Sequence, residues 1–301
     1  MLALTSLPKR YIEAHGRDRV AEIIGVKTGV VAMWIARDKF PLDAVEKLLA
    51  FDPTPLHEVK PLYTNPEPGN KLLILMPCNG SPERDTMRSI MRMYDPKDMD
   101  FETIAFNNLS VVRNQLAAIW LARGHEWAFW ADADSVFPCG NAAWFKQVCD
   151  LPAMPDIFAG VHTIFRLLVH KKSFVSVSYV ARRKGGVPQF SGGESQRVSL
   201  KRGPRDELLP VDWCGFGGVL MNIKVLKDII ATQGEEITVK SDFLRQRFGY
   251  NYHFFSPTNP ETPGDDLPLC KRAIQAGHRP HVDLAIAAGH VGSKIFNYSD
   301  L

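Results

Sequence analysis

Short apolar runs alternate with amphipathic stretches along the C-terminal three quarters of the chain. Residues 71–77 (KLLILMP) and 127–131 (WAFWA) are continuous apolar runs, and a shorter run follows at 157–161. Runs of this kind predict strands that are buried on both faces of a parallel sheet. Residues 87–94 and 111–122 predict helices between them. The alternation predicts an α/β fold with a doubly wound, mostly parallel sheet that binds its ligand at the strand ends.

A proline-rich stretch separates this region from the N-terminus. Residues 53–70 contain five prolines, which cannot sustain a helix or a central strand: Pro53, Pro55, Pro61, Pro66 and Pro68. We therefore predict a small all-α domain at residues 1–52, a linker at 53–70 and a large α/β domain at 71–301.

Residues 20–35 (VAEIIGVKTGVVAMWI) predict two short helices joined at Gly25. Gly25 suits the left-handed conformation of the turn, Ala21 permits a close helix crossing, and Val31 and Trp34 pack beneath the second helix. This spacing resembles the helix-turn-helix of phage repressors, with a further helix from Phe40 to about Leu49; an unrelated three-helix cap is the alternative. Lys27 and Thr28 are the predicted DNA contacts. Few exposed positions suit base edges, so weak DNA contact and protein docking both stay open.

Composition adds little to this picture. The 301 residues are 45% hydrophobic and carry a net charge of +3, which is typical of a globular protein and too small to indicate a polyanion partner by itself. The five cysteines show no zinc-site spacing and predict reduced thiols. No signal peptide or membrane span is apparent, so we expect a cytoplasmic protein, in the host cytoplasm if a phage encodes it.

Acidic residues follow the second strand. Asp132 and Asp134 stand where this buried run stops, and carboxylates there can hold a divalent cation; a solvated turn or a helix cap is the alternative. A helix start upstream carries Arg113 and Asn114, which could reach a ligand. Downstream lie two further motifs, Gly264-Asp265-Asp266 and His290-Val291-Gly292.

In this order, the motifs resemble those of the metal-dependent nucleotide-sugar glycosyltransferases of the GT-A fold. The resemblance covers roughly residues 71 to 292 and lies in the ordered set more than in any single motif. It implies that Asp134 binds the metal directly, that Asp132 contacts the metal or the ribose, and that His290 is the third protein ligand. Hard oxygen ligands suit Mg²⁺ or Mn²⁺, and a histidine favours Mn²⁺. A buried structural histidine is the alternative for His290.

The acidic pair after Gly264 occupies the place of the family's acceptor motif. The resemblance implies that Asp266 or Asp265 deprotonates the acceptor hydroxyl in an inverting enzyme, or positions acceptor or donor in a retaining one. The sequence favours neither stereochemical outcome. Acidic residues also cap helix N-termini, which is the alternative for this pair.

Further donor contacts are implied by the resemblance. The segment 211–220 (VDWCGFGGVL) combines a carboxylate, an aromatic ring and three glycines, so that its backbone can approach a ligand closely. Its predicted nucleotide-sugar contacts are Asp212, Trp213 and Gly217, although such glycines also serve packing alone. Arg113, Asn114, Pro77 and Asn79 complete the predicted nucleotide-sugar site, and uridine diphosphate is the most frequent nucleotide in the family.

A basic segment extends from Arg182 to Arg205. It holds seven Lys or Arg residues against the single acid Glu194, and the predicted DNA contacts in it are Arg182, Arg183, Lys184, Lys201 and Arg202. A solvated surface loop is the alternative. With the helix-turn-helix, the segment suggests DNA carrying a hydroxymethylated pyrimidine as acceptor. Protein or polysaccharide acceptors stay open, as does a DNA-binding regulator that senses a nucleotide sugar without turnover.

Overall fold

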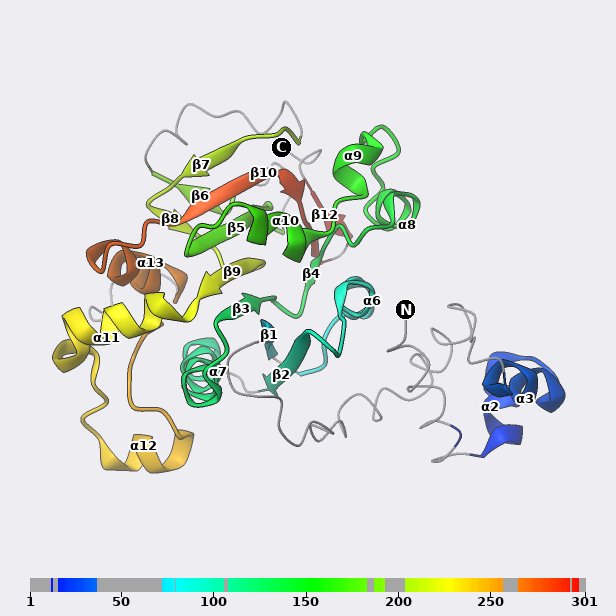
Figure 1. The fold of residues 1–301 in the computed structure, drawn as a ribbon, viewed down its shortest axis with the longest axis horizontal. Helices are drawn as coiled ribbons and strands as arrows, with labels where there is room; N and C mark the ends of the chain where they lie inside the picture. The colour runs from blue at the N-terminus through cyan, green and yellow to red at the C-terminus, as the bar shows by residue number, and fades with distance from the viewer. Residues whose placement is uncertain are drawn as a thin grey trace. The chain divides into compact units, whose positions relative to one another are not determined.

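The computed structural model in Figure 1 describes residues 12, 16–36, 72–78, 80–105, 108–182, 187–192, 204–256, 265–292 and 294–297, without the side chains of 34–36 and 244. The chain separates into two compact units, which are residues 1–66 with 94–97 and residues 67–93 with 98–301. The predicted linker at 53–70 and the third N-terminal helix lie outside the described residues.

A mixed sheet, seven-stranded over the described residues, forms the centre of the larger unit and has the order β2-β1-β3-β9-β5-β10-β7. Strands β2, β1, β3, β5 and β10 run in one direction, whereas β9 and β7 run in the other. The strand bounds are β1 Leu72–Cys78, β2 Met99–Ala105, β3 Trp127–Trp130, β5 Phe174–Ser178, β7 Leu208–Pro210, β9 Val219–Asn222 and β10 His281–Ala287. The strands predicted at 71–77 and 127–131 are therefore confirmed as β1 and β3.

Helices lie on both faces of this sheet. On one face, α7, α11 and α13 pack through a core that contains Leu116, Trp130, Phe216 and Leu269. Helices α11 and α13 lie side by side in Figure 1, and α10 contacts β5 and β9 without contributing to this core, so it covers the opposite face. The helix bounds are α6 Arg84–Met93, α7 Leu109–Arg123, α8 Ala142–Val148, α9 Asp156–Ala159, α10 Thr163–Val169, α11 Ile223–Ile237, α12 Asp242–Phe248 and α13 Asp266–Gln275.

The strand predicted at 157–161 is wrong, because this segment contains the short helix α9. Pro155 precedes the helix with a φ of −59° and Asp156 occupies its first turn. Proline at a helix start and an acid in the first turn both favour a helix. Four residues are too few to show a helical period, so the apolar letters alone resembled a strand.

Two small ladders complete the larger unit. Strand β11 (Gly289–Val291) pairs with β12 (Ile295–Phe296) on one side and with β4 (Ser135–Val136) on the other. Strands β6 (Phe190–Ser191) and β8 (Trp213–Cys214) form the second ladder. The β4–β11 pairing sets His290 opposite Ser135, which joins the end of the chain to the turn that follows β3.

The N-terminal unit contains the two predicted helices, α2 (Arg17–Ile24) and α3 (Thr28–Ala36). Gly25 takes the predicted left-handed conformation with a φ of 80°. The amides of Gly25 and Val26 bond back to Glu22 and Ala21, which ends α2 in a Schellman motif. Ala21 and Val31 are buried, as predicted for a close helix crossing.

Close packing at Gly218 gives a test of the sheet. A Cβ at this position would lie 2.6 Å from the ring of Phe137 and 2.7 Å from a methyl of Val177. Both neighbours are buried, so Gly218→Ala should lower the free energy of unfolding by about 1–3 kcal/mol. Gly234→Ala within α11 is the matched control, because the nearest atom to its Cβ is 3.6 Å away. Urea denaturation should show the control to be neutral or stabilised by up to about 1 kcal/mol; similar losses in both variants would contradict this packing.

Candidate functional site

The site lies at the carboxyl ends of the central strands. Strand β1 is flanked by β2 on one side and by β3 on the other, so the connection from β1 to β2 and the connection from β2 to β3 run in opposite directions across the sheet. In α/β sheets, a crevice forms outside the carboxyl ends of the strands at such a switch point. Asp132 lies two residues after the end of β3. Burial is the main cause that raises the pKa of the Cys78 thiol at the end of β1, and the nearby charges of Asp132 and Asp134 add to it.

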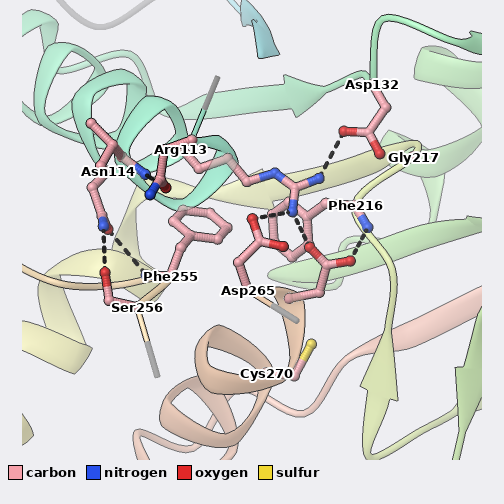
Figure 2. A network of polar contacts seen from close by, with 12 residues as sticks. Arg113, Asn114, Asp132, Phe216, Gly217, Phe255, Ser256, Asp265 and Cys270 are labelled. Carbon is pink, nitrogen blue, oxygen red and sulfur yellow. Dashed lines mark hydrogen bonds and ion pairs between the residues drawn. The ribbon is translucent and has the colours of Figure 1, made fainter. Parts of the chain in front are cut away.

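Arg113 is the centre of the site. Helix α7 begins after Asn108, whose side chain accepts the amide N–H of Val111, and Arg113 follows in the second turn with 1% of its side chain exposed. Its guanidinium donates from Nη2 to Asp132 Oδ1 at 2.7 Å and from Nη1 to Asp265 Oδ2 at 2.7 Å. Asp266 accepts a third bond from Nη1. Figure 2 shows the three carboxylates converging on this one cation.

Helix α13 presents the acidic pair at its first turn. Asp265 holds the N-cap position, yet its side chain makes no capping hydrogen bond, so helix capping does not account for this residue. Both carboxylates turn to Arg113 instead. Asp266 also accepts the backbone N–H of Phe216 at 3.3 Å. The pair thereby joins α13 to α7 and to the glycine-rich segment before β9.

Three carboxylates around one guanidinium leave an excess of negative charge. Burial, opposed by Arg113 and reinforced by Asp265 and Asp132, raises the pKa of Asp266 to about 7. Burial alone would lower the pKa of Arg113, but the three carboxylates outweigh it and raise that pKa above its usual value. Arg113 therefore stays charged, and Asp266 is a carboxyl group that exchanges its proton near neutral pH.

A second group of side chains surrounds Asp134. Strand β11 runs beside the turn after β3, where the amide of Val291 donates to the carbonyl of Asp134 at 2.7 Å. His290 Nε2 then lies 3.4 Å from Asp134 Oδ1, and Arg182 Nη1 lies 2.6 Å from Asp134 Oδ2. Burial opposes ionisation of Asp134, but the hydrogen bond and charge of His290 and the charge of Arg182 lower its pKa overall.

The histidine has the orientation of a metal ligand. Its Nδ1 lies 3.0 Å from the carbonyl oxygen of Val180, which can only accept, so Nδ1 carries a proton. When the ring is neutral, the lone pair of Nε2 faces Asp134, whereas the protonated ring donates its Nε2–H to that carboxylate. Anchoring of one ring nitrogen by a carbonyl is the usual arrangement behind a metal-bound histidine. Asp134 and His290 could therefore supply two of the ligands of a divalent cation.

The third predicted ligand faces elsewhere. Asp132 is bonded to Arg113, and no group of three or more His, Cys, Asp or Glu side chains in the described parts of the chain is arranged to hold a metal ion. The structure thus brings Asp134 and His290 together, and it brings Asp132 to the acidic pair of α13.

Tyr179 lies between the two groups and was not predicted from the sequence. Its ring packs edge-on against His290 with centroids 5.5 Å apart, and its hydroxyl accepts the N–H of Gly217 at 3.0 Å. Burial and the charges of Asp132 and Asp266 raise its pKa. Side chains at Gly215 or Gly217 would collide with this ring, so the glycines make room for it. The feature of the sequence that could have identified Tyr179 is an aromatic residue just after β5, together with the glycines at 215 and 217 that face it.

Other predicted donor contacts have different surroundings. Asn114 is fully buried, and its amide bonds the hydroxyl of Ser256 and the N–H of Phe255, so it tethers that loop and offers no free group to a ligand. Pro77 is buried within β1. Asp212 is exposed and pairs with Arg279, whereas Trp213 packs against the main core.

Few of the predicted DNA contacts fall within the described residues. Lys27 is exposed at the start of α3, and the hydroxyl of Thr28 donates to Asp18 at 2.8 Å, which links α3 to α2. Arg182 is the pairing partner of Asp134. The others, with Asn79 of the nucleotide site, lie outside the described residues: Arg183, Lys184, Lys201 and Arg202.

Comparisons with known proteins give little. No protein-family model matches the sequence, and no curated protein matches it. Among solved structures, the crystal structure of A197 from STIV aligns over 74% of this chain and 86% of its own, with a TM-score of 0.44 and 12% identity. Values this low assign neither a fold family nor a function. In the described residues, no helix has the length and apolar character needed to cross a membrane.

Replacement of Arg113 should destabilise the folded state. Arg113→Met keeps an unbranched apolar stem but leaves three partly buried carboxylates without a counter-charge, so we expect a loss of about 3–5 kcal/mol in the free energy of unfolding at pH 7. Arg123→Met on the same helix is the control, because its pair with Glu102 is partly exposed and should contribute less than about 1 kcal/mol. Equal losses in urea denaturation would show that Arg113 does not neutralise a buried cluster.

The raised pKa of Asp266 predicts a pH dependence of stability. The native state holds a proton on Asp266 that the unfolded chain releases near pH 4, so the contribution of Asp266 to wild-type stability should fall as pH rises from about 4 to 7. Asp266→Asn stays neutral, and its stability relative to wild type should increase over this window, by up to about 4 kcal/mol. The exposed Asp242→Asn gives the same change of charge away from the cluster. A constant difference between Asp266→Asn and wild type across this window would contradict the raised pKa.

Proposed function

We propose that this protein is a metal-dependent glycosyltransferase of the GT-A type, which transfers a sugar from a nucleotide-sugar donor to a hydroxyl acceptor. The observation that carries the proposal is the meeting of two acidic motifs about 130 residues apart: Asp132 and the pair Asp265–Asp266 share Arg113. The Asp134–His290 pair lies beside them, with Tyr179 between. A donor site and a base at one sheet edge are what such a transfer requires.

The donor half rests on Asp134 and His290. A divalent cation held there would neutralise the diphosphate that leaves the sugar, and Mn²⁺ suits a carboxylate with an imidazole nitrogen. The backbone bond from Val291 to Asp134 and the bond between Nδ1 of His290 and Val180 hold both ligands in place. The switch point outside β1 and β3 is the usual place for a nucleotide in an α/β sheet.

The acceptor half rests on Asp266. A general base works best when its pKa lies near the working pH, and a value of about 7 meets that condition. In an inverting reaction, the acceptor hydroxyl gives its proton to the Asp266 carboxylate as its oxygen attacks the anomeric carbon. The N–H of Phe216 and the guanidinium of Arg113 fix the orientation of this carboxylate. In a retaining reaction the same carboxylate positions the substrates.

The acceptor we favour is a 5-hydroxymethylpyrimidine in DNA. The paired helices α2 and α3 with Gly25 between them support it, as does the basic segment that begins at Arg182. A 5-hydroxymethyl group already presents a primary hydroxyl, and access to it in a duplex would require flipping of the base. An enzyme with a protein or polysaccharide acceptor, or a sensor without turnover, would give a different result in the assay below.

The test is release of nucleoside diphosphate from a panel of nucleotide sugars with Mn²⁺, with and without DNA containing 5-hydroxymethylcytosine or 5-hydroxymethyluracil. We expect one donor to release diphosphate and one modified DNA to stimulate the release. Asp134→Asn and Asp266→Asn should each reduce the rate by about 100-fold or more, since each removes a group that acts in the transfer. Asp242→Asn, on the exposed face of α12, should keep the wild-type rate.

Each other result has a distinct meaning. Release that ignores DNA keeps the glycosyltransferase and removes the DNA acceptor. Full activity of Asp134→Asn would refute the proposed mechanism. Binding of a nucleotide sugar with no release from any donor would leave the sensor.

A further inference from the structure

Arg182 pairs with Asp134 beside His290, at the place where a metal cation would bind. It follows β5 by a few residues, and its Nη1 lies 2.6 Å from one carboxylate oxygen of Asp134 while His290 faces the other. About half of the Arg182 side chain is exposed, whereas three quarters of Asp134 is covered. The exposed partner of the pair is therefore the one that can move.

The surroundings of Asp134 favour exchange of its partner. Its main chain is fixed by the amide of Val291, and the nitrogen of His290 that faces it is set by the contact with Val180. Ion pairs of exposed side chains are weak, because water solvates the guanidinium well when it leaves. A divalent cation between the carboxylate and the imidazole would meet two fixed ligands and would repel a guanidinium 2.6 Å from the same carboxylate.

We propose that Arg182 and a divalent cation compete for Asp134. Arg182 then neutralises the metal half-site, which is the pair Asp134 and His290, until the cation displaces it. This inference rests on the proposed function, since it concerns the same metal half-site. Displacement frees a guanidinium at the beginning of the basic segment, at the edge of the sheet where the anionic substrates would enter. Metal binding and the charge presented by that segment are thereby coupled.

The experiment measures Mn²⁺ affinity without substrate, from the electron paramagnetic resonance signal of the free ion. Arg182→Met should bind Mn²⁺ about two- to fivefold more tightly than wild type, because the competitor is gone. Arg182→Lys keeps the charge and should stay close to wild type. Arg245→Met removes a comparably exposed pair with Asp242 on α12 and should change nothing. In an Asp134→Asn background, Arg182→Met should have no effect.

The possible results separate this inference from the proposed function. Mn²⁺ binding by Arg182→Met that is no tighter than wild type, while Asp134→Asn weakens binding, would overturn the competition and leave the metal half-site in place. Unchanged binding by Asp134→Asn would remove the half-site, and with it both the competition and the metal dependence of the proposed transfer.

Discussion

The burial of one guanidinium among three carboxylates is the constraint on which the site depends. Arg113 is held in the second turn of α7, whereas its partners come from the end of β3 and from the start of α13, 19 and 152–153 residues away. Like-charged carboxylates repel one another unless a cation lies between them, and a buried arginine without a partner is costly. Helix α7, the end of β3 and the start of α13 therefore stabilise one another around Arg113. The cluster also joins the helical core face of the sheet to the carboxyl ends of its central strands, because α7 and α13 both pack into the main core.

The two carboxylates in the turn after β3, those of Asp132 and Asp134, have different partners. Asp132 continues toward Arg113, whereas Asp134 enters the β4 ladder and is carried to His290 by the pairing of β4 with β11. Two carboxylates only two residues apart thus have different partners and different electrostatic surroundings. Tyr179 lies close to Asp132 and packs against His290, and its ring leaves no room for side chains at positions 215 and 217. The packing of a single aromatic ring accounts for a glycine pattern that also suits a ligand loop.

Part of the fold could be predicted from the sequence, where the signals are local, but strands β2, β5, β7, β9 and β10 were not predicted. Buried strands gave continuous apolar runs at β1 and β3, and Gly25 marked the end of α2. The arrangement of the site was harder to predict. Arg113 and Asn114 looked equivalent at a helix start, but consecutive residues on a helix point about 100° apart, so one meets the acids and the other meets Phe255 and Ser256. Contacts between residues more than 100 apart, such as Arg113 with Asp265, leave no periodic trace, and the four-residue helix α9 was too short to show one.

The carboxylates of the site outnumber its guanidinium groups. Four carboxylates, those of Asp132, Asp134, Asp265 and Asp266, face two guanidinium groups, those of Arg113 and Arg182, which leaves an excess of two negative charges with all four ionised. The raised pKa of Asp266 is the response of the protein to this excess, since a bound proton relieves part of it. A divalent cation at Asp134 that displaces the Arg182 guanidinium would add one net positive charge, and its field would favour the ionised form of Asp266. In the proposed transfer, the proton on Asp266 and the cation at Asp134 would then be linked through the same charge balance.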